Sequence, residues 1–306
     1  MKHILIGICT VAALLAGLSS CGDAEHITYT DSEYVMFTDT MWVLGIQDSK
    51  EIFDIPVAST QACSYDRNFG VEIVGQKTNA VEGKQFHLLS STVTIKAGEY
   101  SANVKVRGEF DAIEAADSVG LTLRLISEDY QKWDIYNTTD NNYNETHIIL
   151  QKCCPFNLDV FTGYCVLTSS YFNSYMTNVS HLLVKAEKDP DKENSIILKD
   201  CFYKGYDLKM TFDPTNPLEP FISYDEQVFA PTSEAFGTLY GNGKIKMYSP
   251  TGYQSYYSVC EHYVLQYMTL YVDGMAAGTN NAVGSYMNIY EWISDEEAER
   301  IMREGF

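Results

Sequence analysis

The sequence predicts an all-β protein with two successive domains, a β-sandwich followed by an antiparallel β-barrel, and a short helix at the C-terminus. Apolar residues recur with a period of two, as in Val104/Val106 and Leu121/Leu123/Leu125, which is typical of strands with one buried face. Turn residues separate these short runs, and eight or more such runs in the second half favour an up-and-down barrel. A two-sheet jelly roll is the alternative for that second domain.

Residues 1–20 have the features of a signal peptide. Lys2 precedes an apolar run over residues 4–18, which is too short and wrongly flanked for a stable membrane-spanning helix. The run ends in Leu18-Ser19-Ser20-Cys21, which resembles the lipobox of bacterial lipoproteins. This resemblance implies cleavage before Cys21 and lipid attachment to its sulfur, which would anchor the chain to a membrane. An ordinary secretory signal with a coincidental cysteine is the alternative.

Residues 21–26 would form a lipidated tether in which Asp23 and Glu25 follow the cysteine. Acidic residues at this point are similar to the surface-export signal of Bacteroidetes lipoproteins, although Ala24 interrupts them here. The resemblance implies a lipid-anchored protein of the outer membrane, and display at the cell surface is a further expectation.

The composition excludes one class of partner. The chain carries 41 acidic against 21 basic residues, a formal net charge of −20 at pH 7. A surface this acidic repels phosphate backbones, so we do not expect nucleic acid as a partner.

Six cysteines follow Cys21 in the chain: Cys63, Cys153, Cys154, Cys165, Cys201 and Cys260. None of them forms a Cys-x-x-Cys pair, so neither a zinc site nor a thioredoxin-type redox site is indicated. An oxidising envelope permits disulfides in several pairings. Burial as small apolar residues in a β core is the alternative.

The sandwich is predicted over residues 27–153. Strands are expected at residues 34–37, 42–46, 52–57, 71–74, 86–89, 93–95, 102–106, 121–125 and 147–150. This density of short alternating runs favours an antiparallel sandwich. Cys153-Cys154-Pro155 marks the predicted domain boundary, because proline has no amide hydrogen to continue strand pairing.

One stretch of this first domain carries a more specific pattern. Two alternating apolar segments, 91–95 and 102–106, flank Lys96-Ala97-Gly98-Glu99. The pattern is similar to that of Calx-β and related immunoglobulin-like domains, in which two strands flank a tight Gly-Glu turn. Gly98 is suited to the positive φ of a hairpin turn. The resemblance implies an immunoglobulin-like sandwich.

Calcium binding is not part of this expectation. The clustered carboxylates of the calcium-binding Calx-β members are not evident here, and Asp111, Glu114 and Asp117 are expected in a solvated loop. In the second domain, Asp189, Asp191 and Glu193 alternate as in the start of a calcium loop. However, Asn194 stands where that loop needs glycine, so we expect a charged hairpin loop and no metal site.

The second domain, residues 154–306, contains sixteen of the 23 tyrosines. Strands are expected at residues 163–167, 182–186, 195–198, 206–212, 221–224, 227–230, 238–240, 243–248, 263–272 and 286–292. Gly241-Asn242-Gly243 is a tight-turn signal between two of them. Ser294 and Glu297 form a capping box for a final helix with Ala298, Ile301 and Met302 on its apolar face.

The order of these parts also resembles a known arrangement. A lipobox, a sandwich and a tyrosine-rich β domain ending near Tyr290-Glu291-Trp292 are similar to uncharacterised Bacteroidetes lipoproteins. Those proteins pair an immunoglobulin-like module with a calycin-like, that is lipocalin-like, barrel. The resemblance implies a lipocalin-like second domain.

No catalytic residue or cofactor is predicted. The histidines are scattered singly, and the sequence contains no His-Glu-x-x-His, Gly-x-Ser-x-Gly or phosphate-cradling motif. Catalytic groups that converge from distant positions would escape such a search. The pattern nevertheless favours a protein that is not an enzyme.

The candidate ligand contacts are Tyr253, Tyr256 and Tyr257, which we expect on a loop after Pro250-Thr251-Gly252. Exposed aromatic rings can stack on sugars, and loops carry function more often than strands. Tyrosines that simply cover a sheet are the alternative.

These observations favour a non-catalytic binding protein of the cell envelope, an accessory in the capture of oligosaccharide. Two alternatives are a structural or adhesive module that contacts envelope proteins, and a carrier of a small amphipathic ligand inside the barrel.

Overall fold

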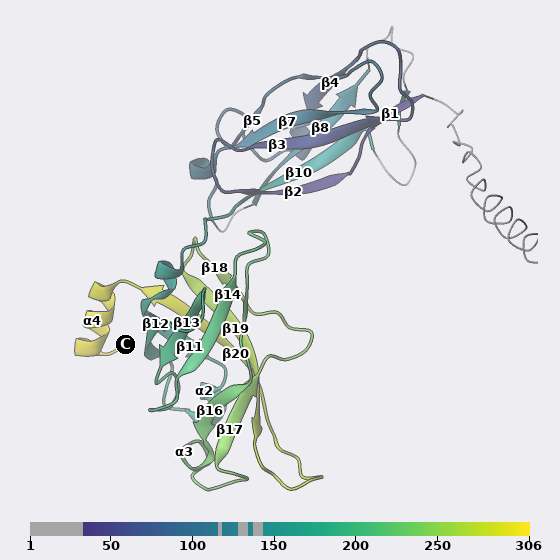
Figure 1. Ribbon diagram of the computed structural model, residues 1–306. Helices are drawn as coiled ribbons and strands as arrows, with labels where there is room; N and C mark the ends of the chain where they lie inside the picture. Colours follow the sequence, from purple (N-terminus) through teal and green to yellow (C-terminus); the bar gives the residue numbers. More distant parts are fainter. Residues whose placement is uncertain (1–32, 116–117, 128–133, 137–142) are drawn as a thin grey trace, which may run out of the picture.

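The computed structural model describes residues 33–115, 118–127, 134–136 and 143–306. The predicted signal peptide (1–20), the lipidation site Cys21 and the tether (21–26) lie outside these residues. The described chain forms a β-sandwich and a β-barrel (Figure 1), each around its own hydrophobic core. The predicted all-β fold is therefore confirmed: sandwich-like sheets, a closed antiparallel barrel of eight strands and a short C-terminal helix.

Two five-stranded sheets make up the sandwich. The first contains, in spatial order, β5 (Phe86–Leu88), β7 (Ser101–Gly108), β3 (Ile52–Ser59), β1 (Tyr34–Phe37) and β9 (Asp134–Ile135). The second contains β2 (Met41–Ile46), β10 (Glu145–Lys152), β8 (Ser118–Ile126), β4 (Arg67–Ile73) and β6 (Thr92–Ile95). The short 3₁₀ helices η1 (Gly75–Lys77) and η2 (Phe110–Ala112) lie between strands. Inward-facing residues such as Val106 and Leu123 are fully buried, as the period of two requires.

Most strand pairs of the sandwich are antiparallel, but β1–β9 and β2–β10 are parallel. These parallel pairs were not predicted. The chain crosses from the first sheet to the second between β1 and β2. Strand β1 therefore pairs with β9 in the first sheet, and β2 pairs with β10 in the second.

The turn at Gly98 adopts the predicted positive φ of 81°, but it is not a hairpin turn. The strands on either side of it, β6 and β7, belong to different sheets. The amide of Gly98 donates to the carbonyl of Cys63 at 2.7 Å, and the nearly fully buried guanidinium of Arg67 donates to the carbonyls of Gln61 and Glu99. The turn therefore connects the two sheets. Its stabilising hydrogen bonds come from Cys63 and Arg67, which lie outside β6 and β7.

The barrel consists of β11 (Gly163–Ser169), β12 (Leu182–Lys188), β13 (Ser195–Lys199), β14 (Leu208–Asp213), β15 (Phe221–Ser223), β18 (Tyr256–Ser258), β19 (Tyr263–Val272) and β20 (Ala282–Ile293). All neighbours are antiparallel, and β20 pairs with both β19 and β11. This double pairing closes the sheet, so the jelly-roll alternative is not adopted.

Two further strands extend the barrel at the end farther from the sandwich (Figure 1). Strand β17 (Lys244–Tyr248) pairs with the last part of β19, and β16 (Gln227–Pro231) pairs with β17. The remaining elements are η3 (Leu158–Phe161), α2 (Phe172–Tyr175) and α3 (Thr232–Phe236).

The predicted strand at residues 238–240 was wrong. Helix α3 ends at Phe236 and is followed by Gly237, which has a φ of 73°. The amide of Tyr240 donates to Oγ1 of Thr232 at 3.1 Å. The segment is thus folded back on the helix that precedes it. The turn at Gly241-Asn242-Gly243 leads from this loop into β17.

Aromatic rings and one polar network fill the barrel interior. Phe161 and Phe212 stack with ring centroids 4.5 Å apart. Near the middle of the barrel, Oε1 of buried Gln266 accepts hydrogen bonds from Nδ2 of Asn288 at 2.9 Å and from the hydroxyl of Tyr290 at 3.0 Å. Because the protein's own side chains occupy this space, the structure does not favour a ligand carried inside the barrel.

The C-terminal helix α4 (Asp295–Glu304) lies beside β11 (Figure 1). The hydroxyl of Ser294 accepts a hydrogen bond from the amide of Glu297 at 3.2 Å, as expected for its N-terminal cap. Ala298 and Ile301 are buried, whereas Met302 is 54% exposed and does not belong to the packed face. Among the described residues, no helix has the length and apolar character needed to span a membrane.

One disulfide joins the segment after the sandwich to the barrel. Cys154, two residues past the end of β10, is bonded to Cys260, which precedes β19. The described cysteines Cys63, Cys153, Cys165 and Cys201 are free thiols, and the last three are buried. Both outcomes that the sequence left open, a disulfide and burial as small apolar residues, therefore occur in this chain.

The disulfide should contribute measurably to stability. It links positions 106 residues apart, and replacing Cys154 and Cys260 with alanine should lower the free energy of unfolding by about 3 kcal/mol, because the unfolded chain gains freedom. Urea unfolding followed by circular dichroism measures this difference, with Cys63→Ala as the control. Equal midpoints for the double variant and the native protein would contradict the prediction.

Candidate ligand-binding surface

The alternation of β19 gives the barrel one apolar inner row and one aromatic outer row. Val264, Gln266, Met268 and Leu270 are fully buried inside the barrel. The residues between them face outward, and they include Tyr263, Tyr267 and Tyr271, all half-buried. Each of these tyrosines is four residues from the next, so they share one face, with about 13 Å between successive members.

Each outward tyrosine of β19 contacts a second tyrosine from the chain segment that precedes it. The ring centroids are 6.1 Å apart in Tyr256–Tyr263, 5.3 Å in Tyr253–Tyr267 and 5.9 Å in Tyr248–Tyr271. We call these six residues the tyrosine ladder, and each pair a rung. Tyr253 is 63% exposed, and Tyr248 and Tyr256 are about two-fifths exposed, so the ladder presents aromatic surface to solvent.

The neighbouring strand β20 adds apolar surface beside the ladder. Met287, which is 39% exposed, is the register partner of Tyr267, and half-buried Ile289 is the partner of Leu265. The outer face of β19 and β20 is therefore less polar than the strongly acidic composition of the chain would suggest.

The middle rung is fixed through the backbone of Tyr267. At this residue, β19 passes from pairing with β18 to pairing with β17. Side chains supply the missing strand partners: the amide of Tyr267 donates to Oγ of Ser255 at 2.9 Å, and its carbonyl accepts from the hydroxyl of Tyr224. Because both backbone groups are bonded, Tyr267 is held on this edge of β19 without a strand partner from β17 or β18.

The rung farthest from the sandwich, Tyr248–Tyr271, lies beside a group of charged side chains. Nζ of Lys246 lies 3.0 Å from Glu226 and 3.5 Å from Asp273, next to Tyr271, the register partner of Lys246. The hydrogen bond from Lys246, followed by one from Tyr271, lowers the pKa of Glu226 below its usual range. Burial, followed by the hydrogen bond to Glu226, raises the pKa of Tyr271. This end of the ladder thus combines an aromatic ring with fixed charges.

The structure separates the three tyrosines predicted as ligand contacts. The expectation of a shared loop was wrong, because Tyr256 and Tyr257 lie on β18 and only Tyr253 lies in the preceding connection. The alternation of β18 places Tyr256 on the outer ladder and Tyr257 in the barrel core.

Tyr257 is only 2% exposed. Its ring centroid lies 5.0 Å from that of Phe212, and its hydroxyl donates to the carbonyl of Asp213 at 3.3 Å. Burial raises the pKa of Tyr257 to about 12. These contacts make Tyr257 a structural residue of the barrel end. It also lines the pocket described below, together with Tyr256, but with little exposed surface.

The remaining members of the ladder, Tyr248, Tyr263, Tyr267 and Tyr271, were not predicted as a site. The spacing of the last three within one predicted strand indicates a shared face. It does not indicate whether that face is inside or outside the barrel, and the partner tyrosines follow only from the register of β17, β18 and β19.

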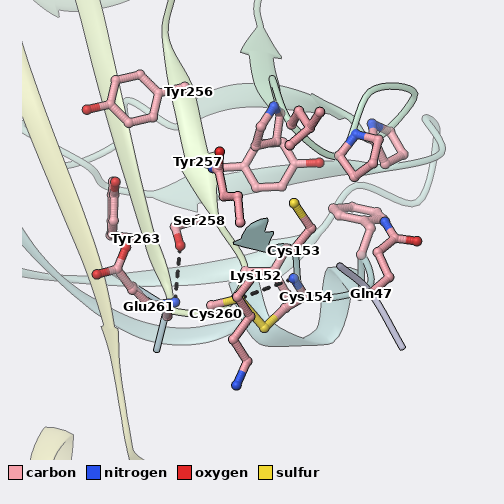
Figure 2. Close-up of a pocket in the computed structure, with 18 residues that line it drawn as sticks. Gln47, Lys152, Cys153, Cys154, Tyr256, Tyr257, Ser258, Cys260, Glu261 and Tyr263 are labelled. Atoms are coloured by element: carbon pink, nitrogen blue, oxygen red, sulfur yellow. Dashed lines mark hydrogen bonds between the residues drawn. A yellow bond between two sulfur atoms is a disulfide. The ribbon is translucent and has the colours of Figure 1, made fainter. Parts of the chain in front are cut away.

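A pocket of about 230 Å³ lies where the sandwich meets the first rung of the ladder (Figure 2). The sandwich contributes Gln47, Gln151 and Lys152, and the barrel contributes Tyr256, Glu261 and Tyr263. Tyr256 and Tyr263 lie on one side of the pocket and Gln47 on the opposite side (Figure 2). Burial raises the pKa of Tyr263 to about 12, consistent with a phenol partly enclosed in this junction.

The acidic loop between β12 and β13 is the charged hairpin connection that the sequence predicts. The carboxylate of buried Asp189 lies 2.8 Å from Nζ of Lys209 and accepts a hydrogen bond from the amide of Asp191. The Lys209 hydrogen bond holds the pKa of Asp189 below its usual range. Within the described parts of the chain, no group of His, Cys, Asp and Glu side chains could hold a metal ion.

The fold and this surface define an all-β protein that combines a sandwich with a closed barrel bearing an outer aromatic ladder. The chain belongs to the family described as domain of unknown function DUF4984, whose model matches residues 142–304. The matched range contains β10, the disulfide and the whole barrel. No curated protein sequence matches the chain significantly.

Solved structures resemble the chain at low identity. The apo form of the Calx CBD1 domain is 10% identical, with 40% of this chain and 98% of that one covered and a TM-score of 0.32. An auxiliary nutrient binding protein from Bacteroides thetaiotaomicron is 12% identical, with coverage of 83% and 89% and a TM-score of 0.33. A two-domain protein of unknown function from Bacteroides fragilis is 9% identical, with coverage of 85% and 88% and a TM-score of 0.33.

Chemical nitration should distinguish the outer tyrosines from Tyr257. Tetranitromethane attacks accessible phenolates, so we expect rapid nitration of Tyr253 and none of Tyr257, whose ring is buried and whose pKa is raised to about 12. Peptide mass spectrometry after limited reaction measures both sites, with exposed Tyr65 of the sandwich as the reference. Equal nitration of Tyr253 and Tyr257 would place Tyr257 at the surface and contradict this arrangement.

Proposed function

We propose that the protein is a non-catalytic binding protein of the cell envelope that captures oligosaccharide along the tyrosine ladder. The main support for this proposal is the set of three tyrosine pairs on the outer face of β19. Tyr253, in the middle pair, is 63% exposed. A tyrosine ring offers an apolar face to the C–H face of a sugar, and its hydroxyl can bond to sugar hydroxyls. Tyrosine also loses little conformational entropy on binding.

The shape of the ladder favours an extended ligand. Its rungs are centred on Tyr263, Tyr267 and Tyr271, so the outer two lie about 27 Å apart along the strand. A single small molecule would contact one rung only. A linear oligosaccharide would contact several rungs in sequence, and weak contacts at each rung would add to a useful affinity.

The charge of the protein favours a neutral ligand over an acidic one. The formal net charge of −20 produces a repulsive field for anions. Lys246, the register partner of Tyr271, is already paired with Glu226 and Asp273. A neutral glycan avoids this repulsion, because its contacts with tyrosine are largely apolar and hydrogen-bonding.

Substitutions in the middle rung should test the ladder directly. Full-length protein purified in detergent is screened on a glycan array, and the affinity for each bound glycan is measured by isothermal titration calorimetry. Tyr253→Ala and Tyr267→Ala should each weaken binding about tenfold, which corresponds to about 1.4 kcal/mol. Tyr65→Ala, which removes a tyrosine that is 54% exposed on the sandwich, should bind like the native protein.

Absence of binding to every glycan on the array, with circular dichroism showing a folded protein, would overturn the proposal. The same holds if a glycan binds but neither ladder variant weakens it. Either result would favour the alternative of contact with envelope proteins through this face.

We also propose that the mature chain is anchored to the outer membrane through lipid on Cys21. The support is the sequence Leu18-Ser19-Ser20-Cys21 after an apolar segment. Metabolic labelling with an alkyne analogue of palmitate should label the native protein, and Cys21→Ala should abolish the label and release the chain from the membrane fraction. Equal labelling of Cys21→Ala and of the native protein would rule out this anchor.

A further inference from the structure

We propose that the protein binds a glycan at the end of its chain, with the terminal sugar in the pocket at the junction between sandwich and barrel. This inference rests on the proposed function of the tyrosine ladder and adds a specificity to it. It predicts that the protein distinguishes chain ends from the interior of a long polysaccharide.

The ladder begins at the sandwich and runs away from it. The first rung, Tyr256–Tyr263, combines β18 with the start of β19, and the last rung, Tyr248–Tyr271, combines β17 with the end of β19. Figure 1 shows β18 at the end of the barrel that adjoins the sandwich and β17 at the far end. A chain that follows the ladder is therefore free to continue beyond Tyr248 but meets the sandwich beyond Tyr256.

The junction pocket lies where such a chain would stop. Its lining includes both tyrosines of the first rung together with Gln47, Gln151 and Lys152 of the sandwich. Its volume of about 230 Å³ is smaller than the roughly 300–1,000 Å³ of pockets for drug-sized ligands. A space of this size suits one small unit, with the sandwich as the wall that ends the groove.

The wall is held in position by covalent and backbone contacts. Strand β10 ends at Lys152, and the disulfide between Cys154 and Cys260 follows immediately. The amide of Cys154 also donates to Sγ of Cys260 at 3.2 Å. The end of the sandwich and the start of β19 are thus fastened within a few residues of the pocket.

The pocket presents polar groups that the protein does not use itself. Among the described residues, the side chains of Gln47, Gln151 and Glu261 have no hydrogen-bond or ion-pair partner, while the amide of Glu261 donates to Oγ of Ser258 (Figure 2). Two amides and a carboxylate can donate to and accept from sugar hydroxyls. A terminal sugar has one hydroxyl more than an internal unit, because the glycosidic bond at that position is missing.

The lining also has an apolar part that suits the ring of a sugar. Pro217, Leu218 and Val259 line the pocket beside the polar groups. Nζ of Lys152 lies 4.3 Å from the ring centroid of Phe110, so this cation already has a partner. The free groups are then neutral amides and one anion, which again favours a neutral sugar over an acidic one.

The number of proteins bound per glycan chain tests this inference. Full-length protein in detergent is titrated with xylo-, cello- and manno-oligosaccharides, from disaccharide to hexasaccharide, and with length-fractionated polysaccharides of the same series. Recognition of ends predicts the same number of bound proteins per chain at every length, measured by calorimetry and by sedimentation. A number that rises in proportion to chain length would overturn end recognition while leaving the ladder's function intact.

Variants of the pocket give a second readout. Gln151→Ala and Glu261→Ala should each weaken oligosaccharide binding about tenfold, whereas Glu299→Ala, which removes an exposed carboxylate from α4, should leave it unchanged. Native affinity in both pocket variants would also overturn the inference. If no glycan on the array binds, or if binding does not depend on Tyr253 and Tyr267, the proposed function itself fails, and the inference fails with it.

Discussion

Closure of the barrel by β20 is the constraint on which the rest of the second domain depends. Because β20 pairs with β19 on one edge and β11 on the other, every residue of β19 must point either into the closed interior or out to solvent. Gln266 points inward and Tyr267 outward. The tyrosine ladder is thus the outer half of the same alternation that builds the core.

The buried polar network stabilises that choice. Oε1 of Gln266 accepts from Asn288 and Tyr290, and Oδ1 of Asn288 accepts from the hydroxyl of Ser169 at 2.6 Å. A shift of β19 by one residue would move Gln266 to the surface and turn the outward tyrosines into the barrel. Asn288 and Tyr290 of β20 would stay buried without their acceptor, at a cost of about 1–3 kcal/mol each, so the network disfavours the alternative register and keeps the ladder outside.

The filled interior also explains why the candidate site lies on the outside of a barrel. Aromatic rings, from Phe161 and Phe212 at one end to Tyr171 and Phe229, which contact each other at 5.1 Å, occupy the space that a carrier would leave for its ligand. Binding surface must then come from outward residues and from the junction with the sandwich. The Cys154–Cys260 disulfide fastens that junction beside the first rung, which joins the ladder and the pocket into one continuous surface.

The sequence by itself determined the all-β class, the extents of most strands, the cap at Ser294 and the positive φ of Gly98, because these depend on preferences within a few neighbouring residues. The aromatic character of the second domain was equally evident. Only the tertiary structure decided that Gly98 connects two sheets, that Cys154 pairs with Cys260, and that Tyr256 faces outward while its neighbour Tyr257 is buried. The physical reason is that sheet membership, register and barrel closure are set by contacts between residues far apart in the chain, as in the rung formed by Tyr248 and Tyr271.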